Sequence, residues 1–158
     1  MNAPVDRRAR GSVSVEVAVL APAFIALIVL AGVTGRTAVA DEAVESAAHD
    51  AARAASISRD AATARAAARD AARRQLDWRR LNCEGAPKIT FSGSVRGRPA
   101  GFDAAYRSPV GQPASVTVAI TCVVSHADLQ APGLPGVPLR TTASATFTSP
   151  LDRYRSRG

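Results

Sequence analysis

Residues 17–33 form the longest uncharged apolar stretch of the chain. Their sequence is VAVLAPAFIALIVLAGV, and as a helix these 17 residues would extend about 26 Å. Extending the stretch back to Val13 gives 21 residues and about 30 Å, close to the thickness of a bilayer core, and takes in one carboxylate, Glu16. The pattern predicts a transmembrane helix, and Pro22 inside it is the expected position of a kink.

A second helical pattern follows over residues 34–81. It contains no Pro, its last Gly is Gly35, and small apolar residues recur with a period near 3.6. Because nothing interrupts the two patterns, they predict one unbroken helix of roughly 68 residues from Ser14 to Leu81, on the order of 100 Å long. The sequence NCEGAP at 82–87 supplies Asn, Gly and Pro as stop signals for this helix.

Beyond Pro87 the period changes from 3.6 to two, which is typical of strands with one buried face. Three segments show the alternation: residues 89–95, 116–124 and 137–148. A three-stranded antiparallel sheet is marginally stable alone, so we expect it to pack on the end of the long helix. Leu76, Trp78 and Leu81 are the large apolar residues available there.

These elements predict an α+β fold. A long N-terminal membrane-spanning α-helix continues outside the membrane and packs at its C-terminal end on a small antiparallel sheet of about three strands. The predicted parts are a basic leader (1–11), a transmembrane helix (12–35), an extracytoplasmic Ala-rich helix (36–82), a small β domain (83–150) and a basic tail (151–158).

The composition argues against an enzyme. Ala fills 34 of 158 positions and only 4% of residues are aromatic, so the chain lacks the side chains of a large packed core. It has two His and contains no zinc-protease motif, phosphate loop or nucleophile elbow. We therefore predict no catalytic residues, no metal, no cofactor and no small-molecule substrate.

A formal charge of +7 would ordinarily raise nucleic acid as a partner. Three of the arginines, however, are Arg7, Arg8 and Arg10, which precede the apolar stretch and by the positive-inside rule hold the N-terminus in the cytoplasm. Six more lie in residues 61–80, where Trp78 is the single aromatic residue among them, whereas residues 41–60 carry five acids and two Arg. We expect a solvated helix surface or a subunit contact here, and no nucleic acid.

The two cysteines, Cys83 and Cys122, lie at the predicted helix end and on the predicted inward face of the central strand. If this region is exported, oxidation is expected, and a bridge would contribute roughly 3 to 4 kcal/mol in the chain-entropy model. Two buried free thiols remain the alternative. A zinc site using both cysteines and the two histidines is disfavoured, because His49 would lie about 50 Å up the helix.

The leader resembles a known signal. A short basic segment, then Gly11, a carboxylate (Glu16) as the fifth residue after it and an immediate hydrophobic helix are similar to the prepilin signal of type IV pilin-like proteins. The run VEVAVLAPAF, with Pro22 six residues after Glu16, resembles the TadE/TadG-like minor pseudopilins of the tight-adherence (Flp) pilus machinery. The resemblance covers residues 7–35.

This resemblance implies a membrane-anchored structural subunit of a pilus or secretion system. It implies that a prepilin peptidase cuts between Gly11 and Ser12, leaving 147 residues, and that other pilin-like subunits are the partners, contacted through the N-terminal helix. The protein would reside in the cell membrane as a single-pass protein with an extracytoplasmic C-terminal domain, or be extracted into a pilus.

The position of Glu16 has a physical consequence that does not depend on the family resemblance. A carboxylate at the edge of a membrane helix needs a partner, and the new α-amino group of Ser12 in a neighbouring subunit would supply one. The simpler alternative is that Glu16 lies at the headgroup level and favours the helix N-terminus.

Two other interpretations stay open. The protein could be an unprocessed, membrane-anchored binding module. Alternatively, the sequence Ala38-Val39-Ala40 has the small-x-small form of a signal peptidase site, which would give a secreted module. Against the latter, the apolar stretch is long for a signal peptide and Arg36 lies close to the site.

Overall fold

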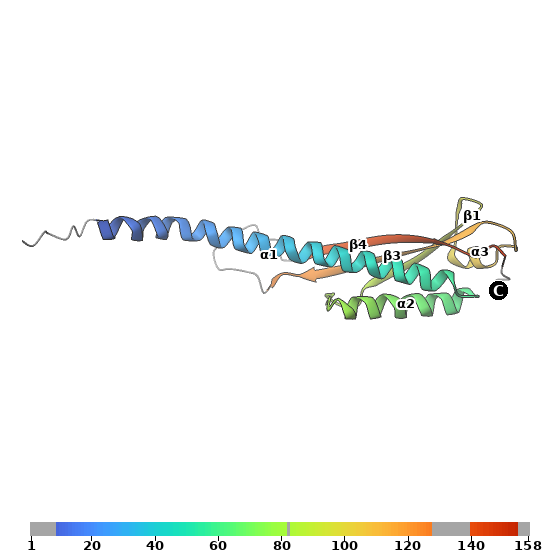
Figure 1. Ribbon diagram of the computed structural model, residues 1–158. Coiled ribbons are helices and arrows are strands. Elements are labelled where there is room, and N and C mark those ends of the chain that lie inside the picture. Colours follow the sequence, from blue (N-terminus) through green and yellow to red (C-terminus); the bar gives the residue numbers. More distant parts are fainter. Residues whose placement is uncertain (1–8, 82, 128–139, 155–158) are drawn as a thin grey trace, which may run out of the picture.

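The computed structural model describes residues 9–81, 83–127 and 140–154. Helix α1 (Ala9–Ser56) runs along the length of the molecule (Figure 1). Its C-terminal half lies between a second helix, α2 (Ala61–Trp78), and the long strands of a sheet, and its N-terminal half extends beyond them. The folded body is therefore built around the second half of α1.

Helix α1 has 48 residues, a length of about 72 Å, and it ends at Ser56 instead of continuing to Leu81. The prediction of one unbroken helix is wrong. Around residues 57–60 the chain reverses, and α2 returns alongside α1 (Figure 1). The reversal uses no Gly or Pro: the side chain of Asp60 accepts a hydrogen bond from the Thr63 amide at 2.8 Å and so caps the start of α2.

The helical hairpin has an interface made almost wholly of alanine. Because Ala side chains are small, the two backbones can approach closely, and the reversal buries an Ala face that a single rod would leave exposed. The fully buried alanines of the two helices are Ala43, Ala47, Ala48, Ala51, Ala52, Ala55, Ala64, Ala68 and Ala72.

The sheet has four antiparallel strands in the order β2-β1-β3-β4. They are β1 (Lys88–Val95), β2 (Arg98–Ala100), β3 (Ala114–Ser125) and β4 (Arg140–Pro150). The three long strands confirm the predicted alternation, although residues 137–139 of the third predicted strand lie outside the described residues. The fourth strand, β2, is a short addition joined to β1 by a two-residue turn in which Arg96 and Gly97 both have positive φ.

One face of the sheet packs against α1. Along β3, buried and half-buried residues alternate, and the buried set faces the helix: Ala114, Val116, Val118, Ile120 and Cys122. A short helix, α3 (Phe102–Tyr106), closes one end of this core, and its Tyr106 hydroxyl donates a hydrogen bond to the carbonyl of Ala55. The fold class is thus α+β with a long N-terminal helix on an antiparallel sheet, as predicted.

Of the three large residues expected to pack on the sheet, Leu76 is buried and Leu81 is partly buried against the core. Trp78 is 81% exposed, so its predicted packing is wrong. It lies at the end of α2, where the helix turns its Ala face to α1 and leaves this position in solvent.

Candidate membrane and assembly site

The N-terminal half of α1 exposes large apolar side chains. Those of Val17, Val19, Leu20, Phe24, Ile25, Leu27, Ile28 and Leu30 are all at least half exposed. Among the described residues one helix is long and apolar enough to cross a membrane, and very little of its apolar segment is buried. A contiguous exposed apolar surface of this kind needs a lipid or protein environment.

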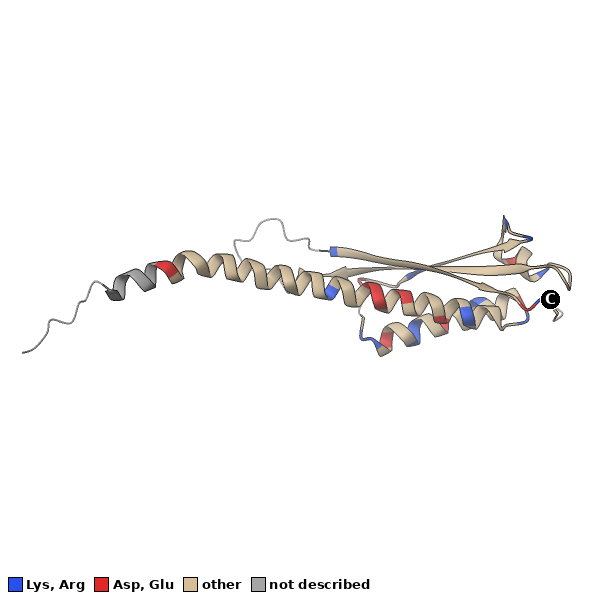
Figure 2. Cartoon of the chain, turned by 45° about the horizontal axis from the view of Figure 1, so that its top comes forward, with Lys and Arg blue, Asp and Glu red and all other residues tan. Residues whose placement is uncertain are grey.

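Figure 2 shows few charged residues on this half of α1: an acidic residue (red) lies near its start, and a basic residue (blue) lies where the folded body begins. The acid there is Glu16, whose side chain is exposed, and the next charged residue along the chain is Arg36. Glu16 therefore stands at the outer edge of the apolar surface, at the position the sequence indicated.

The expected processing residues lie at the start of the same helix. Arg10, Gly11 and Ser12 are in the first turns of α1, and Ser12 precedes Glu16 by one helical turn. Arg7 and Arg8 lie outside the described residues. Pro22 lies inside α1, where the helix continues through it without the hydrogen bond that its nitrogen cannot donate.

The hairpin brings the acidic part of α1 beside the basic end of α2. Glu42 and Arg79 form an ion pair across the two helices at 3.0 Å. On one unbroken helix the centres of these two charge blocks, residues 41–60 and 61–80, would lie about 30 Å apart. In the folded chain they face each other within one molecule, because α2 runs back along α1 (Figure 1).

A second ion pair joins α2 to α3. Arg65 donates two hydrogen bonds to the carboxylate of Asp103, at 2.9 and 2.5 Å, and its guanidinium lies over the Phe102 ring at 4.7 Å. The hydrogen bonds from Arg65 lower the pKa of Asp103 below its ordinary value and raise the pKa of Arg65. The Thr63 amide likewise lowers the pKa of Asp60.

The two cysteines form a disulfide, with their Cα atoms 5.3 Å apart. The bridge links the chain just after α2 to β3, and the amide of Glu84 donates to the carbonyl of Val123 at 2.7 Å beside it. The predicted disulfide is confirmed, and the alternative of two free thiols is wrong.

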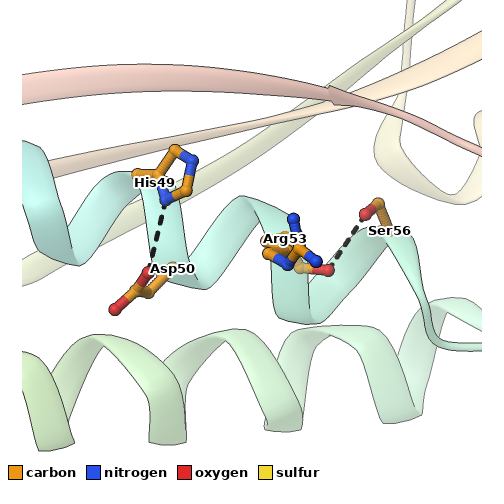
Figure 3. Close-up of polar contacts among 4 residues, drawn as sticks. All are labelled: His49, Asp50, Arg53 and Ser56. Atoms are coloured by element: carbon orange, nitrogen blue, oxygen red, sulfur yellow. Dashed lines mark hydrogen bonds and ion pairs between the residues drawn. The ribbon is translucent and has the colours of Figure 1, made fainter.

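The middle of α1 carries a small polar group, shown in Figure 3. His49 points towards the strands, where its ring meets that of Phe147 edge-on at 4.5 Å, while its Nδ1 lies 3.3 Å from a carboxylate oxygen of Asp50. Nearer the helix end, the Ser56 hydroxyl donates to the carbonyl of Arg53. The ring contact joins α1 to β4, and the Ser56 hydroxyl gives the Arg53 carbonyl in the last turn of α1 a hydrogen-bond donor. Both contacts are structural.

His126, the other histidine, is fully buried at the end of β3, and its Nε2 lies 2.9 Å from the Thr141 hydroxyl. With both cysteines oxidised, the zinc site weighed above has lost its thiolates. In the described part of the chain, no three His, Cys, Asp or Glu side chains are grouped as metal ligands would be.

The model of the family described as TadE-like protein matches residues 11–53. This segment of the chain is similar to TadE-like proteins. The match begins at Gly11 and covers the exposed apolar half of α1 and most of its packed half, so the resemblance of the run VEVAVLAPAF to TadE-like proteins is confirmed. No curated protein and no solved structure matches the chain.

The TadE-like segment and the helix able to cross a membrane together support a membrane protein related to the tight-adherence pilus. The rival signal peptidase site at residues 38–40 falls inside this segment, in the middle of α1, and Ala40 is buried against the folded body. Cleavage there would divide both the helix and the TadE-like segment.

Sequence reasoning missed the residues that fold the hairpin and join it to the sheet. Asp60 is the N-cap of α2, and an Asp at the start of a helical period is a usable N-cap signal. No local signal pairs Arg65 with Asp103, because they are 38 residues apart and meet only through the tertiary fold.

Proposed function

We propose that this chain is a TadE-like minor pseudopilin, a single-pass membrane subunit with a structural role in a tight-adherence pilus or a related secretion system. One observation carries the proposal: the TadE-like segment coincides with a helix whose first half exposes large apolar side chains beyond the folded body. Such a helix can be held in a bilayer and later exchange lipid contacts for contacts with the helices of other subunits.

In this proposal the N-terminus is cytoplasmic and the helical hairpin with its sheet is extracytoplasmic. The charge of Arg7, Arg8 and Arg10 favours this orientation. The disulfide between Cys83 and Cys122 supports it independently, because structural disulfides persist on the oxidising side of the membrane.

The first turns of α1 then serve processing and assembly. A prepilin peptidase cuts between Gly11 and Ser12, and the new α-amino group pairs with Glu16 of a neighbouring pilin-like subunit, fixing the axial register of the bundled helices. Glu16 is exposed at the edge of the apolar surface, where an ion pair between subunits would be partly shielded from water.

Processing is tested by intact mass. The full-length chain is produced in membranes with and without the matching prepilin peptidase, and the mass of the extracted protein is measured. With the peptidase, the proposal predicts loss of residues 1–11, and Gly11→Ala should block that loss because a side chain at the cleaved bond hinders the peptidase.

Gly35→Ala is the matched control. It makes the same change in the same helix, and an added Cβ there meets nothing within 4 Å, so processing should be unaffected. An unchanged mass in the presence of active peptidase would contradict the processing step and favour the unprocessed membrane-anchored module; a product beginning at Asp41 would favour the secreted module.

A further inference from the structure

An open cavity of about 450 Å³ lies where the folded body meets the apolar half of α1. Gly35, Arg36 and Val39 of α1 form one side of it, and Arg36 is three residues, or about 4.5 Å along the helix, beyond the last residue of the apolar stretch. Between these two residues the Thr34 hydroxyl lies within hydrogen-bonding distance of the Leu30 and Ala31 carbonyls. With the apolar half of α1 in a bilayer, as proposed above, the cavity lies close to the membrane surface.

The other side of the cavity comes from the end of α2 and from β3. Arg79, Arg80 and Leu81 follow α2 directly, and Val124 and Ser125 end β3. The disulfide between Cys83 and Cys122 lies two residues from each of these groups and fastens them together. A cavity held in this way loses little conformational freedom when a ligand binds.

The charge of the lining has one sign. Three arginines line the cavity, and no acidic residue is among the described residues that line it. Guanidinium groups form paired hydrogen bonds with phosphate oxygens, and Val39, Leu81 and Val124 add an apolar part that suits a lipid better than a fully hydrated anion.

Arg79 also pairs with Glu42, but both side chains are more than a third exposed. Such a surface pair is weak and is readily exchanged for a phosphodiester at the edge of a bilayer. The pair with Glu42 therefore keeps the Arg79 side chain near the cavity and leaves it able to bind a phosphodiester.

The backbone conformation at Arg80 also indicates a role for this side chain. Helix α2 ends in a Schellman motif, with the Leu81 amide bonded to the Leu76 carbonyl and the Arg80 amide to the Asp77 carbonyl. Arg80 occupies the left-handed position of this motif, with φ of 52°, where Gly is ordinarily found. An arginine costs stability at this position, which points to a use for its side chain.

We propose that this cavity binds the phosphodiester headgroup of an anionic phospholipid in the leaflet that faces the folded body, with Arg36, Arg79 and Arg80 contacting the phosphate. The lipid fixes the depth and rotation of α1 before assembly. The inference rests on the membrane anchoring in the proposed function.

The test uses the full-length protein in mixed micelles containing equal amounts of phosphatidylglycerol and phosphatidylcholine with matched acyl chains. Native mass spectrometry measures the ratio of the two lipids retained. Each basic residue at an anionic surface contributes about a fivefold preference, so wild type should clearly favour phosphatidylglycerol, and Arg79→Gln/Arg80→Gly, which leaves Arg36 in place, should lower that preference about 25-fold.

The control is Arg73→Gln/Arg74→Gln, which also removes two positive charges, but from residues of α2 that do not line the cavity. It should keep the wild-type ratio. The single variant Arg80→Gly separates fold from function, because it should raise or preserve the unfolding temperature while it lowers the lipid preference.

The proposal is overturned if wild type shows no preference or if the control loses it equally. It is also overturned if soluble glycerol phosphate binds to the protein as well as the lipid does, which would make a free phosphate the ligand. Membrane anchoring is measured separately, by resistance of wild type to alkaline extraction from vesicles, so failure of the proposed function is distinguished from failure of the lipid site.

Discussion

At the scale of single residues, the ion pair between Arg65 and Asp103 is one of the contacts that fix the hairpin to α3. The pKa of the Asp103 carboxyl lies below its ordinary value of 3.8, because the Arg65 guanidinium donates hydrogen bonds to the ionised form. A carboxylate with a depressed folded pKa stabilises the fold fully above its unfolded pKa, and this contribution disappears as the pH falls through the folded value.

Asp103→Asn should therefore lower the unfolding temperature near neutral pH, and the gap from wild type should close as the pH falls below about 3.8. Thermal unfolding of the detergent-solubilised protein, followed by circular dichroism, measures this. Asp70→Asn, at an exposed carboxylate of α2, is the control and should give a smaller gap near neutral pH. A gap for Asp103→Asn that is the same at every pH would contradict the role of the ionised pair.

Residue pairs of this kind lie beyond what the sequence can predict. Glu16 and Gly11 stay predictions that rest on a short local pattern, whereas the disulfide could be predicted because each cysteine has one possible partner. Arg65 is one of six arginines in a stretch of Ala, and only the position of α3 selects it as the partner of Asp103.

At the scale of elements, strands were predicted well because period-two alternation in residues 89–95 and 116–124 follows directly from one face being buried. The helical hairpin was missed because a stretch free of Gly and Pro gave no warning of a reversal. Burial of alanine against alanine, together with the Asp60 cap, stabilises the hairpin over a single rod, and such weak, spread contributions leave little mark on the sequence.

The disulfide is the strongest single link between the hairpin and the sheet. Replacing both cysteines, as Cys83→Ser/Cys122→Ser, should lower the free energy of unfolding by roughly 3 to 4 kcal/mol, because the closed loop of 39 residues then regains its freedom in the unfolded chain. Denaturant unfolding of the extracted protein measures the change.

Reductant gives a matched comparison without any substitution. Wild type treated with reductant should unfold like the double variant, and the double variant should not respond to reductant. If the oxidised and reduced forms of wild type unfold at the same denaturant concentration, the bridge does not hold the two parts together as described.

At the scale of the whole molecule, the two halves of α1 differ in charge and in burial. The first half of α1 is almost free of charge and is exposed, as a lipid-facing or subunit-facing helix requires. The second half packs into an α+β body that the disulfide stabilises. Nine of the 19 arginines, whose number suggested nucleic acid by composition alone, lie in the leader and in residues 61–80.

The central claim, a structural role in a tight-adherence pilus, is tested most directly by counting pili on source cells that lack this chain. The account predicts that deletion abolishes pili or sharply reduces their number, that wild type restores them, and that Glu16→Gln, although inserted and processed, restores them poorly. Wild-type numbers of pili on the deletion strain would contradict it.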